Sequence, residues 1–370
     1  MEEFVAAVLD LLADEIGGVE ALETIFRGDT SNDVAEVRFA DGRTLMIKRA
    51  QVPGSLDRFA TSRLASRLLR EHTKVVVPVY LELPPTLDDQ PGLAYWRIDR
   101  PTLSKLWKGL DPEARESTLR SWGRLMRRIH EVRLPGHGLL LVAVERPVSL
   151  AEFLSTDLEG RLRPAVERDW RRGLRVIDAL IEAIPAVSAR VGRGGGVLAH
   201  NDLWYANILC APDGDAVRCV GVLDFEDVLA GPPELDVAKT EVVHGPLFGN
   251  ELTGDWLRHL CEGYGDGWDP LAIRFFRTYH RINMGYHAAV GGHRDHADEV
   301  GELPRAAVLL PGEQVPEGRQ VNRRGHDHPD NRKRSPPPRR PFRQDGADEV
   351  ARFTEKELDA LDASSDPLSP

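Results

Sequence analysis

The sequence predicts an α+β fold with two lobes, the first built around antiparallel strands and the second mainly helical. Short apolar runs separated by turn residues dominate the first hundred residues, where Asp41-Gly42 is a hairpin signal. Longer segments with apolar residues at helical spacing follow, as over 112–129. A chain of 370 residues is long enough to bury the core of two such lobes.

Each expected element rests on a local pattern. Strands are predicted where apolar runs lie between turn residues, over 21–26, 34–39, 44–48, 75–81 and 93–98. Helices are predicted where the apolar period is close to 3.6, over 56–71, 112–129 and 270–289, and a long helix or a pair of helices over 163–190. Asp111 and Pro112 form a typical helix start. An amphipathic helix over 4–16 would bury one apolar stripe, made of Phe4, Val8, Leu11, Leu12 and Ile16.

The most informative segment is 200–209, which reads His-Asn-Asp-Leu-Trp-Tyr-Ala-Asn-Ile-Leu, followed by Val-Leu-Asp-Phe-Glu over 222–226. Phosphoryl transfer requires a carboxylate that accepts the proton of the attacking hydroxyl and oxygen ligands for magnesium. Asp202 suits the first role. Asn207 and Asp224 suit the second, because Mg²⁺ prefers a few hard oxygen ligands.

The runs around this segment predict how these side chains meet. Apolar residues over 207–210 and 217–223 flank the turn signal Pro-Asp-Gly-Asp, which predicts a hairpin. Such a hairpin would bring Asn207 and Asp224 to the same end, within reach of one metal ion. The alternative is that Asp202, Asn207 and Asp224 are ordinary loop residues.

These two segments resemble the signature of the aminoglycoside phosphotransferase and choline kinase family, small-molecule kinases with a protein-kinase-like fold. The family pattern is approximately His-Gly-Asp-Leu-x-x-x-Asn-Ile-Leu, then Ile-Asp-Trp/Phe-Glu, and Asn201 takes the place of its Gly. The resemblance implies ATP and Mg²⁺ as cofactors. It also implies that Asp202 is the catalytic base and that Asn207 and Asp224 are the Mg²⁺ ligands.

The resemblance implies supporting residues and a division of the chain as well. His200 would hold the catalytic loop, and Asp236, in the segment Gly-Pro-Pro-Glu-Leu-Asp, would buttress it. Residues 1–100 would form a nucleotide-binding lobe of antiparallel strands, and residues 101–291 a mainly helical catalytic and substrate lobe.

A phosphate-binding region is expected in the first lobe. The connection between the first two strands is small and polar, so its backbone N–H groups can approach phosphates. Lys48 ends the third strand and can pair with the phosphates, as in kinase-type lobes. Each feature alone is a weak signal, but both precede the catalytic segment in the right order. The expected nucleotide-binding residues are Gly28, Thr30, Ser31, Asn32 and Lys48.

One departure from the family bears on catalysis. Kinase-like lobes pair that Lys with a Glu on the following helix, and the corresponding position here is Ser62 or Thr61. Asp57 and Glu71 lie a turn or more away. Either another acid positions Lys48, or the ion pair is absent and the chain is a catalytically degenerate nucleotide-binding protein.

Net charge, apolar run lengths and cysteine spacing limit the kinds of partner that the sequence predicts. A net charge of −11 argues against general nucleic-acid binding, and no apolar run reaches membrane-spanning length. The three cysteines lack metal-ligand spacing, and the first residues lack the basic region of a signal peptide, so we expect reduced thiols and a cytoplasmic protein. The expected partner is a small hydroxyl-bearing acceptor, which is aminoglycoside-like, an amino alcohol or a sugar. The oligomeric state stays open.

Two regions are less informative. Apolar periodicity fades from about residue 292, and residues 312–341 are rich in Arg, Pro, Gly, Asn and Asp, so we expect 292–370 to be a disordered tail that adds nothing to the chemistry. Its basic, Pro-rich run could still bind a partner or touch nucleic acid. In the second lobe, six residues either face the acceptor or belong to the core and surface: Glu226, Asp227, Glu234, Trp256, Tyr264 and Tyr279.

Overall fold

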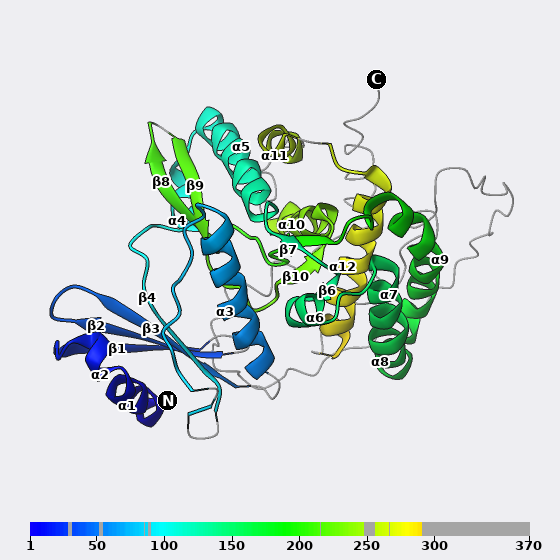
Figure 1. Ribbon diagram of the computed structural model, residues 1–370. Coiled ribbons are helices and arrows are strands. Elements are labelled where there is room, and N and C mark those ends of the chain that lie inside the picture. The colour runs from blue at the N-terminus through cyan, green and yellow to red at the C-terminus, as the bar shows by residue number, and fades with distance from the viewer. Residues whose placement is uncertain are drawn as a thin grey trace, which may run out of the picture.

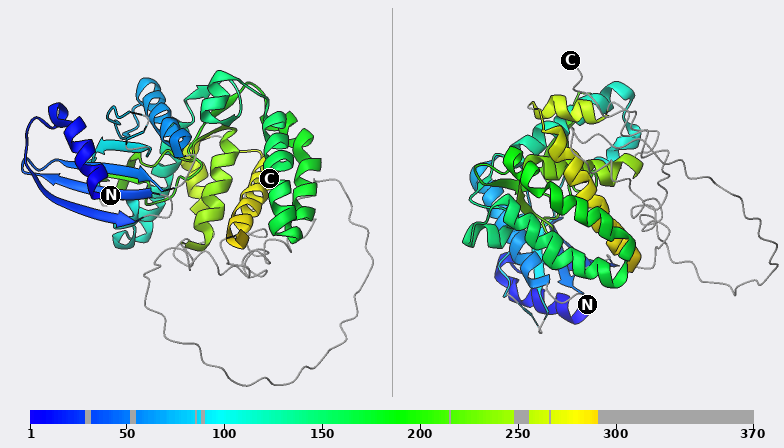
Figure 2. Two further views of the ribbon diagram at one scale, coloured as in Figure 1. Left: turned by 90° about the horizontal axis from the view of Figure 1, so that it is seen from below. Right: turned by 90° about the vertical axis from the view of Figure 1, so that its right-hand side faces the viewer.

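The computed structural model describes residues 1–290 with the exception of 29–31, 52–54, 85, 88–89, 215, 248–255 and 266. The expected tail, and the expected phosphate contacts of Thr30 and Ser31, therefore lie outside the described residues. The chain forms an amino lobe around a sheet and a larger, mainly helical carboxyl lobe, which lie at opposite ends of the molecule in Figures 1 and 2.

The amino lobe contains a four-stranded antiparallel sheet in sequence order. Its strands are β1 (Ala21–Gly28), β2 (Asn32–Phe39), β3 (Thr44–Ala50) and β4 (Gly92–Trp96). The strand expected over 75–81 is wrong. This segment makes only isolated bridges, from Val76 to Gly221 and from Tyr80 to Tyr95, because it passes between two sheets. Pro78 also lacks the N–H that a continuous ladder needs.

Two short helices, α1 (Glu2–Leu11) and α2 (Ala13–Ile16), cover one face of this sheet. Phe4, Val8, Leu12 and Ile16 are buried there, as the stripe predicted. Leu11 is 51% exposed, so its assignment to the stripe was wrong. The buried residues follow steps of four positions, which turn the stripe away from Leu11.

The other face of the sheet carries helix α3 (Ser55–His72), where Phe59 packs against Ala50 and Leu93. Successive side chains of a strand point to opposite faces, so Lys48 lies on the same face as Ala50, two positions away. By the same alternation Leu45 and Ile47 face α1 and α2. The register of β3 therefore points Lys48 toward the face that carries α3.

The carboxyl lobe combines helices with two small sheets, of order β5-β7-β10-β6 and β8-β9. Asp111 caps α5 as expected, with its carboxylate 2.8 Å from Ala114 N. Residues 163–190 form a pair of helices divided near Trp170, which is one of the two arrangements expected there. The elements are α4 (Leu103–Leu106), the 3-10 helix η1 (Trp107–Gly109), α5 (Pro112–Ile129), β5 (Arg133–Leu134), β6 (Gly138–Leu139), α6 (Leu140–Glu145), α7 (Leu150–Ser155), the π-helix η2 (Thr156–Leu162), α8 (Arg163–Asp169), the 3-10 helix η3 (Arg171–Gly173), α9 (Leu174–Val191), β7 (Gly196–Ala199), β8 (Ile208–Asp213), β9 (Ala216–Val222), β10 (Leu229–Gly231), α10 (Pro233–Leu247), α11 (Trp256–Tyr264) and α12 (Pro270–Val290).

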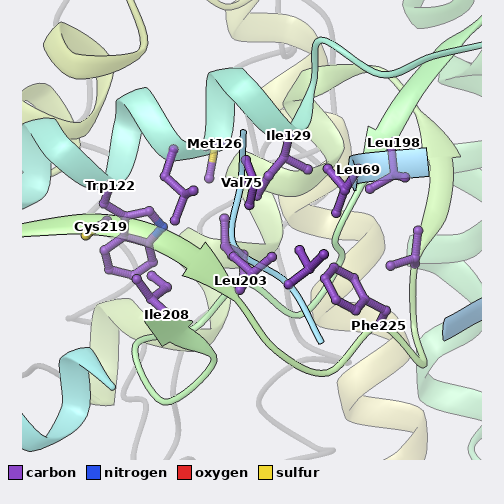
Figure 3. Packing of buried hydrophobic residues seen from close by; sticks show 14 of the residues in the cluster. Leu69, Val75, Trp122, Met126, Ile129, Leu198, Leu203, Ile208, Cys219 and Phe225 are labelled. Carbon is purple, nitrogen blue, oxygen red and sulfur yellow. The ribbon is translucent and has the colours of Figure 1, made fainter. Parts of the chain in front are cut away.

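The largest apolar cluster joins the two lobes. Trp122, Met126 and Ile129 of α5 pack in it together with Leu69 of α3 and Phe225, which follows β9 (Figure 3). A second cluster lies among α7, α8, α9, α10 and α12. Of these, α7, α8 and α9 lie at the end of the molecule away from the amino lobe (Figures 1 and 2). Within the described ranges, no helix is long and apolar enough to cross a membrane.

The aromatic residues considered for an acceptor site are core residues. Trp256 and Tyr264 are buried in the cluster around α5, and Tyr279 is buried in the cluster around α9. The structure thus favours the packing role over a direct role at the substrate for all three.

A buried ion pair joins α10 to α12. Arg277 Nη2 lies 2.7 and 2.8 Å from the two carboxylate oxygens of Glu241, and both residues are 8% exposed. Removing one partner of a buried pair leaves the other charge without its counter-ion. We expect Glu241→Ala to lower the free energy of unfolding by about 3–5 kcal/mol in urea denaturation.

The matched control is Glu23→Ala, which removes a pair with Arg38 in which both side chains are about half exposed, at 53% and 46%. Its expected cost is at most about 1 kcal/mol, because solvent screens exposed charges. Equal losses in the two variants would contradict the prediction.

Candidate active site

Asp202 lies on the loop that follows β7 and precedes β8, and its partner on that loop is Asn207. The amide nitrogen of Asn207 donates to the backbone carbonyl and to the carboxylate of Asp202, each at 3.0 Å. This pair of hydrogen bonds closes the loop on itself and fixes the direction of the Asp202 carboxylate. With its nitrogen turned to Asp202, the amide of Asn207 presents its oxygen elsewhere.

The residue before Asp202 has a left-handed backbone. Asn201 has a φ of 57°, a conformation that Gly adopts freely and that Asn tolerates better than most residues. This explains why Asn can stand where the family pattern has Gly. The Asn201 amide also donates to the carbonyl of Asp227 at 3.1 Å, which ties the loop to the segment after β9.

Asp236, on the first turn of α10, anchors the start of the same loop. It is fully buried, and its carboxylate accepts hydrogen bonds from the backbone N–H groups of His200 at 2.8 Å and Asn201 at 2.7 Å. A third partner is the ring of His130 at the end of α5, at 3.1 Å. Burial would raise the pKa of Asp236, but these hydrogen bonds and the adjacent His rings hold it below its usual value.

His200 links the loop to the β8–β9 hairpin. Its Nε2 lies 2.9 Å from the carbonyl of Leu223, the residue before Asp224, and so donates to it. Burial lowers the pKa of His200, which favours the neutral ring. Leu223 N in turn donates to Asn207 O at 2.8 Å. The hairpin therefore brings Asn207 and Asp224 to the same end, as the sequence predicted.

Lys48 lies between two carboxylates of the segment after β9. Its Nζ is 2.9 Å from Asp224 Oδ1 and 2.9 Å from Glu226 Oε1. Burial would lower the pKa of Lys48, but Asp224 and Glu226 outweigh that effect and raise it, so Lys48 is a cation. The two acids beside Lys48 come from the segment after β9 and not from α3, and the expected contact of Lys48 with phosphates stays a prediction.

Gly28 and Asn32 were also expected to bind the nucleotide. Gly28 is the last residue of β1 and pairs with Asp33. Asn32 begins β2, and its amide nitrogen lies 3.0 Å from both carboxylate oxygens of Glu226. The sequence interpretation missed this role of Glu226. The only signal for it was its position two residues after Asp224.

The electrostatics of the site suit a divalent cation. The pKa of Asp202 is raised to about 7, mainly by burial and further by the charges of Asp227 and Asp224, while Lys239 acts in the opposite direction. Such crowding of carboxylates is relieved by a bound cation. The carboxylate of Asp224 and the amide oxygen of Asn207 are hard oxygen donors at one end of the hairpin, which fits Mg²⁺.

The model of the Phosphotransferase enzyme family matches residues 23–276 of the chain. The chain belongs to this family. The matched range contains every residue discussed above from Gly28 to Asp236. No curated protein sequence matches this phosphotransferase-family protein significantly.

Solved phosphotransferase structures share the fold at low identity. Macrolide 2′-phosphotransferase MphH from Brachybacterium faecium is 21% identical, with a TM-score of 0.52 over 83% of this chain and 99% of that one. The streptomycin–ATP complex of APH(2″)-IIa is 14% identical, with a TM-score of 0.56 over 81% and 98%. An aminoglycoside phosphotransferase APH(4)-Ia complex with ADP and hygromycin B is also 14% identical, with a TM-score of 0.59 over 83% and 100%. The predicted two-lobed, kinase-like α+β fold is confirmed.

The left-handed backbone at Asn201 can be tested by a matched pair of substitutions. Asn201→Gly and Asn201→Ala both remove the hydrogen bond to Asp227, but only Ala opposes the positive φ. We expect the Ala variant to be less stable than the Gly variant by about 1–2 kcal/mol in chemical denaturation. Equal stabilities would show that the loop relaxes to another backbone conformation.

Proposed function

We propose that this protein transfers the γ-phosphoryl group of ATP, with Mg²⁺, to a hydroxyl group of a small molecule. The observation that carries the proposal is the meeting of Asp202, Asn207, Asp224 and Lys48 at one end of the β8–β9 hairpin. Family membership supports phosphotransfer as the reaction class. Phosphoryl transfer asks the protein mainly for positioning and charge stabilisation, and these residue types supply both.

In this proposal each residue has a distinct role. Asp202 accepts the proton of the acceptor hydroxyl, and its hydrogen bonds from Asn207 direct the carboxylate. Asn207 and Asp224 would hold Mg²⁺, which neutralises charge on the phosphates when bound. Lys48 would pair with the phosphates. His200 and Asp236 do not touch the reacting atoms and act by holding the loop.

The acceptor is proposed only as a class. The similar structures are described as macrolide and aminoglycoside phosphotransferases, and two of them are complexes with streptomycin and hygromycin B. These compounds carry several hydroxyl groups on sugar-like rings. An acceptor screen should therefore contain aminoglycosides, macrolides, amino alcohols and sugars, with ATP and GTP compared as donors because GDP complexes occur among the similar structures.

The first functional prediction concerns the base. Asp202→Asn keeps the size of the side chain but removes its basicity, so turnover should fall by roughly 10²–10⁴-fold while nucleotide binding persists. The matched control is Asp213→Asn, on the exposed turn of the hairpin, which should leave turnover unchanged. Near-normal turnover by Asp202→Asn would remove Asp202 from this role.

A second functional prediction concerns the metal. Asp224→Ala should weaken Mg²⁺-dependent nucleotide binding more than Asp202→Asn does, because only Asp224 is proposed to hold the ion directly. Nucleotide affinity is to be measured by calorimetry over a range of Mg²⁺ concentrations. Identical Mg²⁺ dependence in the two variants would count against the assignment.

The competing interpretation is a degenerate kinase that binds nucleotide without transferring phosphate. It is motivated by Thr61 and Ser62, which stand where a kinase-like helix carries its acid. Mg²⁺-dependent turnover of ATP by the wild-type protein in the acceptor screen would exclude it, and tight ATP binding without any turnover would favour it.

A further inference from the structure

Helix α3 brings no carboxylate to the position where the family has one. Thr61 and Ser62 are both buried there, and the Ser62 hydroxyl donates to the carbonyl of Arg58 within the helix at 3.0 Å. An acid that positions Lys48 therefore has to come from another element.

The loop after β9 supplies a buried carboxylate that fits this need. Glu226 Oε1 lies 2.9 Å from Lys48 Nζ, and the Glu226 side chain is 6% exposed. Asp224, the other acid beside Lys48, is 35% exposed and is the residue proposed to hold Mg²⁺. When Asp224 is occupied by a cation, Glu226 is the carboxylate that remains for Lys48.

Glu226 is itself held from the amino lobe. The Asn32 amide on β2 donates to both of its oxygens at 3.0 Å, and Arg58 Nε on α3 lies 3.8 Å from Oε2. Arg58 Nη2 also pairs with Asp227 Oδ1 at 2.8 Å. Helix α3 thus presents a cation, Arg58, whereas a kinase-like helix presents an acid. The carboxylate beside Lys48 is Glu226 of the loop after β9.

We propose that Glu226 is the positioning residue of Lys48, and that it takes over the task that a helix carboxylate performs in other members of the fold. This inference rests on the proposed function, because it assumes that Lys48 contacts the phosphates of a nucleotide. Glu226 fixes the Lys48 ammonium on the sheet face next to Asp224, while Asn32 and Arg58 fix Glu226. The ammonium is then in place before the nucleotide arrives.

The test is a double-mutant cycle on the full chain with Glu226→Gln and Lys48→Met. We measure the Kd of ATP in the presence of Mg²⁺ by calorimetry, kcat/KM for ATP, and the melting temperature. Loss of a residue that orients a ligand-binding side chain costs on the order of 10- to 100-fold, so this drop is expected in kcat/KM for Glu226→Gln. Glu226→Asp, which keeps the charge, should lie closer to the wild type.

Because Glu226 would act through Lys48, the two losses should not add. In the Lys48→Met background, Glu226→Gln should change kcat/KM and Kd by less than about 2-fold. The Mg²⁺ concentration at half-maximal activity should be the same in Glu226→Gln and the wild type. Glu262→Gln, which changes a carboxylate that contacts Arg120, Arg258 and His259, is the control and should match the wild type in kcat/KM, Kd and Mg²⁺ dependence.

Four results would overturn the inference. Additive losses in the double mutant would show a general structural role. A shifted Mg²⁺ requirement in Glu226→Gln would make Glu226 a metal ligand instead. Unchanged kinetics in Glu226→Gln, with normal turnover by the wild type, would overturn this inference and leave the proposed function intact, whereas no nucleotide binding or turnover by the wild type would overturn both.

Discussion

The carboxylate of Asp236 lies where α5, α10 and the loop after β7 meet. Asp236 belongs to α10, and its carboxylate accepts hydrogen bonds from the loop after β7 and from His130 at the end of α5. Two of its donors are consecutive backbone N–H groups, those of His200 and Asn201, which lead directly into Asp202. A buried carboxylate is costly unless it is fully hydrogen-bonded, and here its partners are main-chain groups of the loop itself. The Asp236 carboxylate therefore holds the backbone next to Asp202 through His200 and Asn201, and so helps to orient Asp202.

From this anchor the rest of the site follows by short steps. His200 donates to the carbonyl before Asp224, Asn207 binds Asp202, and the hairpin ladder sets Asn207 opposite the start of the Asp224 segment. Lys48 then reaches this group of acids from the opposite lobe. The site is a chain of fixed polar contacts in which each residue limits the freedom of the next. Such preorganisation suits a reaction that depends on positioning.

The sequence predicted those parts of the site that are set by local geometry. Asn207 and Asp224 lie together because one hairpin joins them, as predicted, and Asp202 lies on the loop that leads into it. The start of α5 was found from Asp111 and Pro112. The pairing of Lys48 with Glu226 spans 178 positions, and that of Asn32 with Glu226 spans 194. No periodicity or turn signal reports on contacts at that separation. The same limit explains the error over 75–81, where an apolar run with strand character is used to bridge two sheets.

The cluster around Trp122 bears on whether the carboxyl lobe could fold without the preceding part of the chain. Ala65, Leu69, Val75 and Val77 all precede residue 100, yet they complete the core around α5. A fragment that began after residue 100 would expose the surface that these side chains cover, at about 1.5–3 kcal/mol for each large apolar residue. The carboxyl lobe is therefore not a unit that recombination could transfer alone.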